Sequence, residues 1–119
     1  MPRSRGLVDR ICDYNGALSD PQRVKMMKIM GSSPADTVTV SDFAKILGIS
    51  QPSATKHLKI LHAVDLIDRK RIGAAIYYSL NLQVIDEYHQ LLELAFVKGF
   101  LPCQYGYKCG ECPDKETCS

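Results

Sequence analysis

Apolar residues recur at helical spacing along most of the chain, and short polar or glycine-containing breaks divide them into successive helices. A first helix is predicted from about residue 5, with an apolar stripe of Leu7, Val8, Ile11, Cys12 and Leu18. Ser19 or Asp20 can cap a second helix that begins at Pro21, because proline suits the first helical position. We expect its buried stripe to be Val24, Met27, Ile29 and Met30, and its solvent face to be Arg23, Lys25 and Lys28.

Residues 41–63 read as two short helices joined by a tight turn. Ser41 or Asp42 is expected to cap the first, whose inward residues are Phe43, Ala44, Ile46 and Leu47. Gly48 ends it, and Ser50 caps the second, where the stripe is Ala54, Leu58 and Leu61. Pro52 falls in the first turn, where a missing N–H costs nothing.

Strand-forming residues follow on both sides of Gly73, in segments 66–71 and 75–80, and predict a β-hairpin. Residues 37–40 are β-branched and too few for more than a small strand or an extended lead-in. A last helix is predicted over residues 82–100, and the breadth of its apolar stripe indicates a subunit interface. The fold class is therefore mainly α with a small β-hairpin (α+β), in a winged helix-turn-helix arrangement that dimerises through its terminal helices.

The helix that Ser50 caps has an outward set of amides, hydroxyls and amines without an acid among them. Such groups suit base edges and phosphate oxygens of DNA. The hairpin adds a basic segment, so that the predicted DNA-binding residues are Gln51, Ser53, Thr55, Lys56, Lys59, Arg69, Lys70 and Arg71. His57, next to the apolar stripe, is expected to be a packed or capping residue.

Composition narrows the class of protein. The 119 residues are 45% hydrophobic and 24% charged, which is typical of a soluble globular chain. No apolar run approaches the roughly 20 residues that span a bilayer, and no signal-peptide pattern opens the chain, so a cytoplasmic protein without a membrane role is expected. The net charge is only +2, but the basic residues concentrate in the helix-turn-helix and hairpin segments, residues 41–80.

Four segments in order give the chain a more specific resemblance. They are LSDPQR at 18–23, DFAKILGISQ at 42–51, HLKIL at 57–61 with Ser53 before it, and IYYSL at 76–80. Over about residues 7–100 the sequence resembles the ArsR family of small repressors. The resemblance implies a homodimer whose paired recognition helices enter successive major grooves of a palindromic operator in double-stranded DNA, and repression that an effector releases.

The metal sites of that family are where the sequence departs from it. Arsenic and cadmium sensors carry a cysteine pair at the start of the third helix, but Thr39 and Ser41 stand here. Zinc and nickel sensors place Asp and His pairs along the last helix, where only Asp86 and His89 are available. We expect neither site.

Four of the five cysteines instead lie in the last 17 residues, at Cys103, Cys109, Cys112 and Cys118. We therefore divide the chain into a DNA-binding and dimerisation domain at 1–100 and a metal-binding tail at 101–119. In a reducing cytosol clustered thiols favour metal over disulfides. Their spacing fits a zinc site, and also fits an iron–sulfur cluster or an arsenite site with one cysteine spare. Disulfides and an unstructured tail are the remaining alternatives, and Cys12 is expected in the core or as an extra ligand.

The predicted function is a transcriptional repressor that senses a metal, metalloid or redox signal through this tail. No enzyme activity is expected, since no nucleotide-binding glycine loop or Ser/His/Asp set is present. Two alternatives remain. One is a winged-helix module that binds protein and has a structural zinc tail, and the other is a thiol redox protein that uses Cys109 and Cys112.

Overall fold

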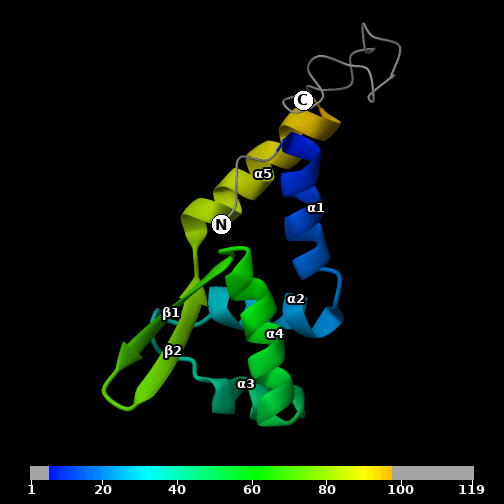
Figure 1. Cartoon of the computed structure of the whole chain (residues 1–119). Coiled ribbons are helices and arrows are strands. Elements are labelled where there is room, and N and C mark those ends of the chain that lie inside the picture. The colour runs from blue at the N-terminus through cyan, green and yellow to red at the C-terminus, as the bar shows by residue number, and fades with distance from the viewer. Residues whose placement is uncertain (1–5, 98–119) are drawn as a thin grey trace, which may run out of the picture.

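The computed structural model describes residues 6–97, which form five helices and one hairpin (Figure 1). A helical head lies beside the hairpin, and two further helices project away from the head (Figure 1). In chain order the elements are α1 (Leu7–Ala17), α2 (Pro21–Gly31), α3 (Val40–Leu47), α4 (Gln51–Ala63), β1 (Ile67–Ile72), β2 (Ala75–Leu80) and α5 (Leu82–Phe96). This order confirms the predicted fold class, a winged helix-turn-helix.

The turn between α3 and α4 has the predicted chemistry. Gly48 ends α3 with φ +67°, a left-handed conformation that glycine adopts without a Cβ clash. Ser50 caps α4 by accepting a hydrogen bond from the Ser53 N–H. The cap of α3 is different from the predicted one, because Thr39, and not Ser41 or Asp42, is its N-cap residue. Thr39 and Asp42 form a reciprocal capping box, in which Asp42 accepts from the Thr39 N–H at 2.9 Å.

The hairpin is an antiparallel pair in which Ile67 lies opposite Leu80 and Ile72 opposite Ala75. Gly73, at φ +63°, begins the two-residue loop between the strands. Val38 forms an isolated antiparallel bridge with Tyr78, whose N–H donates to the Val38 carbonyl at 2.9 Å. The extended lead-in predicted at residues 37–40 is therefore confirmed for Val38, while Val40 already belongs to α3.

The core lies where α2, α3, α4 and the base of the hairpin meet. Its most completely buried large side chains are Met26, Phe43, Leu58, Leu61, Leu66 and Ile67. The predicted stripe of α4 is correct, but two other predictions of burial are wrong. Val24 and Ile46 are 41% and 61% exposed, and Met26, which the prediction omitted, is fully buried.

Helices α1 and α5 pack on each other where they project from the head, and their buried residues extend the same core (Figure 1). The rings of Tyr14 and Tyr88 are tilted by 57° at a centroid distance of 5.2 Å, and Arg10 forms an ion pair with Glu87 at 2.8 Å. The buried residues of α1 are Leu7, Ile11, Tyr14 and Ala17. Val8 and Cys12 of the predicted apolar stripe are both exposed, so the expectation that Cys12 lies in the core is wrong. The described part of α5 ends at Phe96.

Candidate nucleic-acid interface

The outer face of α4 presents the predicted polar residues together. Gln51, Ser53, Lys56 and Lys59 are exposed, Thr55 is half-buried, and a shallow open groove is lined by Gln51, Pro52, Thr55, Lys56 and Lys59. The opposite face of the same helix carries the fully buried Ala54, Leu58 and Leu61. Because the helix is fixed through that apolar face, its polar face is held in one orientation toward solvent.

Two side-chain contacts order the first turn of α4. The Gln51 amide Nε2 donates to the Ser41 hydroxyl of α3 at 2.9 Å, and the Ser50 hydroxyl donates to that of Ser53 at 3.0 Å. Gln51 is thus connected to α3, and Ser53 is connected to Ser50, the N-cap residue of α4. Sequence reasoning predicted Gln51 but gave Ser41 no such role.

The hairpin carries three exposed basic residues on β1, namely Arg69, Lys70 and Arg71. Alternation along a strand places Arg69 and Arg71 on one face and Lys70 on the other. Lys70 lies 3.6 Å from a carboxylate oxygen of Asp36, in the segment before α3, and Arg71 donates to the Gly73 carbonyl at 3.4 Å. The Lys70 side chain is 64% exposed, so its pair with Asp36 is a weak surface contact.

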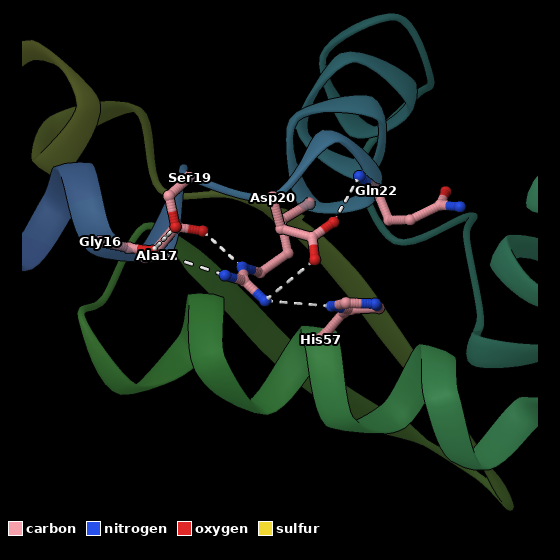
Figure 2. Close-up of polar contacts among 7 residues, drawn as sticks. Gly16, Ala17, Ser19, Asp20, Gln22 and His57 are labelled. Atoms are coloured by element: carbon pink, nitrogen blue, oxygen red, sulfur yellow. Dashed lines mark hydrogen bonds and ion pairs between the residues drawn. The ribbon is translucent and has the colours of Figure 1, made fainter.

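Arg23 of α2 connects its own helix to α1 and α4, and Figure 2 labels its partners Ala17, Asp20 and His57. Its Nε donates to the Ala17 carbonyl at the end of α1 at 2.6 Å, and its Nη1 lies 3.2 Å from Nδ1 of His57 on α4. Asp20, the N-cap of α2, lies 3.9 Å from the same guanidinium. Only 11% of the Arg23 side chain is exposed, so the prediction that it lies on the solvent face of α2 is wrong.

His57 has the packed position that the sequence indicated. A guanidinium has no acceptor, so His57 must accept at Nδ1, and its remaining ring proton must be on Nε2. No sequence signal identified Arg23 as the partner, because its acceptors lie in α1 and α4 and are brought together only by the fold.

The positions considered for metal in the third and last helices have other partners. Thr39 caps α3, Ser41 accepts from Gln51, and Asp86 accepts from the Gln90 amide at 2.8 Å. Between residues 6 and 97, no three His, Cys, Asp or Glu side chains gather closely enough to hold a metal ion. The predicted ligands Cys103, Cys109, Cys112 and Cys118 lie outside the described residues.

Comparison with known proteins gives the same assignment at the level of the family. Residues 20–69 match the model described as bacterial regulatory protein, arsR family. The chain is 38% identical over 71 residues to the transcriptional repressor SdpR of Bacillus subtilis, and this match covers 60% of the chain and 76% of SdpR. It is 35% identical over 82 residues to the cadmium resistance transcriptional regulatory protein CadC homolog of Staphylococcus aureus, over 68% of this chain and 63% of that protein.

Solved structures show the same fold. An ArsR-like transcriptional regulator from Rhodococcus superposes with a TM-score of 0.67 at 23% identity, over 76% of this chain and 83% of its own. The homodimeric winged helix-turn-helix DNA-binding domain of a Mycobacterium bovis protein gives 0.60 at 20% identity, over 75% and 81%. At these identities the likeness concerns the fold alone. In the part of the chain that the structure describes, no helix is long and apolar enough to cross a bilayer.

Proposed function

We propose, from the premise that the chain belongs to the ArsR family of bacterial regulatory proteins, that it represses transcription as a homodimer on a palindromic operator. The family consists of DNA-binding transcriptional regulators and not of enzymes. The observation that carries the proposal is the outer face of α4, where amide, hydroxyl and ammonium groups are exposed together above a buried apolar face. In helix-turn-helix proteins the corresponding helix lies in the major groove, and its N-terminal residues contact base edges.

Each predicted contact residue has a role that its position suits. Gln51, Ser53 and Thr55 lie in the first turns of α4 and would approach bases or nearby phosphates, with Lys56 beside them. Lys59, further along the helix, and the hairpin residues Arg69, Lys70 and Arg71 would contact the phosphate backbone.

Exposed apolar residues on the two projecting helices support the homodimer. Val8 of α1, Leu94 and Phe96 of α5, and Val97 directly after it are between 39% and 66% exposed. Exposed large apolar side chains of this kind are typical of interaction surfaces. A two-fold dimer through α1 and α5 would cover them and present two copies of α4 to the two halves of a palindrome.

The signal is proposed to act at the four cysteines of the tail. Thiolates bind soft metal ions, and the similarity to a cadmium resistance regulator supports a metal or metalloid effector. Zinc, an iron–sulfur cluster and arsenite are the candidate ligands. Elemental analysis and an absorption spectrum of anaerobically purified protein distinguish them, since a cluster is coloured and zinc is not. Exchanging Cys109 and Cys112 for Ser should abolish binding, and unchanged metal content in that variant would refute the site.

The salt dependence of DNA binding tests the repressor proposal. Every phosphate that the protein neutralises adds about −0.9 to the slope of log K against log salt concentration. We expect a steep slope for a palindromic duplex and a slope shallower by about 2 for Lys59→Ala, because the homodimer loses one phosphate contact in each protomer. Lys28→Ala is the matched control, because Lys28 lines a pocket with Ile85 and His89 of α5 and with none of the proposed contact residues, so the slope should be unchanged. A slope near zero for the unaltered protein would exclude DNA as the partner and favour a protein-binding module.

A further inference from the structure

Gln51 is the first residue of α4, and its side chain does not extend freely into solvent. Its amide Nε2 donates to the Ser41 hydroxyl on α3, ten residues earlier in the chain, at 2.9 Å. A glutamine side chain loses on the order of 2 kcal/mol of rotamer entropy when it is ordered. In this protein part of that ordering is already present before any ligand arrives.

The contact also determines which hydrogen-bonding groups of Gln51 remain available. A glutamine amide has two N–H donors and one carbonyl acceptor. Ser41 takes one donor, so one N–H and the Oε1 atom remain available. In the major groove an adenine presents the complementary pair, with N7 as acceptor and the N6 amino group as donor.

From this geometry we propose that Ser41 is a specificity-determining positioning residue: it orients the Gln51 amide to read the major-groove edge of an adenine in an A·T base pair. The inference rests on the proposed function, since it needs α4 in the major groove. Ser41 itself does not contact the base. It acts through Gln51, and its effect is on the choice of sequence more than on overall affinity.

Ser41 is itself held in a fixed place. The capping box of Thr39 and Asp42 surrounds it in the first turn of α3, and Phe43, which is fully buried, anchors that turn to the core. On the other side, Ala54 is fully buried and anchors the first turns of α4. The hydroxyl and the amide are thus presented by two helix ends that the core holds together, which is the condition for pre-organised recognition.

Selection from a library of randomised duplex DNA, followed by sequencing of the bound fraction, tests the inference and works on any operator sequence. The unaltered protein should enrich a symmetric motif with an adenine that Gln51→Ala no longer requires, at a loss of about 5- to 150-fold in discrimination at that base pair. Ser41→Ala should lose roughly 2- to 10-fold at the same base pair only, the range expected for one hydrogen bond. Ser41→Thr, which retains the hydroxyl, should restore it.

Ser32→Ala is the matched control, because Ser32 is an exposed serine whose hydroxyl bonds the Lys28 carbonyl at the end of α2. It should enrich the same motif as the unaltered protein. If Ser41→Ala enriches that motif with undiminished preference at every position, or if the Gln51-dependent base is a guanine, the inference about Ser41 is overturned while the repressor proposal stands. If the unaltered protein enriches no motif, both fail. Thermal unfolding of each variant verifies that it is folded.

Discussion

Replacement of Arg23 by Met should destabilise the folded protein more than replacement of the exposed Lys25 of α2 by Met. The substitution keeps an unbranched side chain of similar reach but removes the hydrogen bonds to the Ala17 carbonyl and to His57. The guanidinium donates both hydrogen bonds. The shorter one, to Ala17, contributes about 1.5–3 kcal/mol, as hydrogen bonds of charged groups do, and the longer one, to His57, about 0.5–1.5 kcal/mol. Because only 11% of the Arg23 side chain is exposed, water cannot fully replace these contacts.

The expected loss in the free energy of unfolding is therefore about 2–4 kcal/mol. Urea unfolding followed by far-ultraviolet circular dichroism measures it, at one protein concentration because dimer stability depends on concentration. Arg23→Lys should lose an intermediate amount, since an ammonium cannot reach the acceptors as a planar guanidinium does. Lys25→Met, an exposed residue on the same helix, should change stability by less than about 0.5 kcal/mol.

If Arg23→Met and Lys25→Met were equally stable, the assignment of Arg23 as the link between α1, α2 and α4 would be wrong. A double-mutant cycle with His57→Ala separates the two contacts. We expect a coupling energy of at least about 0.5 kcal/mol between Arg23 and His57, as residues in direct contact show. A coupling of zero would leave the Ala17 carbonyl and Asp20 as the partners of the guanidinium.

Two further predictions concern the backbone and the tyrosine between α1 and α5. Gly48→Ala should lower the free energy of unfolding by about 1–2 kcal/mol because φ is +67°, although no atom stands where the Cβ would be. Gly16→Ala, equally uncrowded but within α1, should raise it by roughly 0.5 kcal/mol. Equal effects of the two substitutions would contradict the role of φ. Burial, and then the nearby Glu87 carboxylate, raise the pKa of Tyr14 above its usual value of 10.0. The resulting stabilisation is complete below pH 10 and is lost as the pH rises through the raised pKa, so stability measured against pH should fall more in the unaltered protein than in Tyr14→Phe; parallel curves would refute this.

Local chemistry made the helix-turn-helix predictable, whereas tertiary contacts account for the errors. Gly48, Ser50 and Pro52 act within a few residues of themselves, so their roles follow from sequence alone. The burial of Met26 and Arg23 depends on which neighbours the fold brings to α2, and a periodicity that favoured Val24 could not reveal it.

The candidate DNA-contact residues were named from the same pattern, and the structure places those of α4 on one exposed face. The hydrogen bond from Gln51 to Ser41 joins two different helices, so no reading of either helix in isolation predicts it. The expectation that Cys12 is part of the core failed because α5 covers the face of α1 that carries Tyr14.

The bridge between Val38 and Tyr78 allows the side chains of the hairpin to vary without loss of its attachment. A hairpin of two strands is marginal by itself, and here a main-chain hydrogen bond of 2.9 Å joins it to the segment that leads into α3. Since main-chain atoms make this bond, exchanging the side chains at Arg69, Lys70 or Arg71 leaves it intact. Mutation, natural or engineered, can therefore change the charge of the hairpin while its attachment to the segment before α3 is retained.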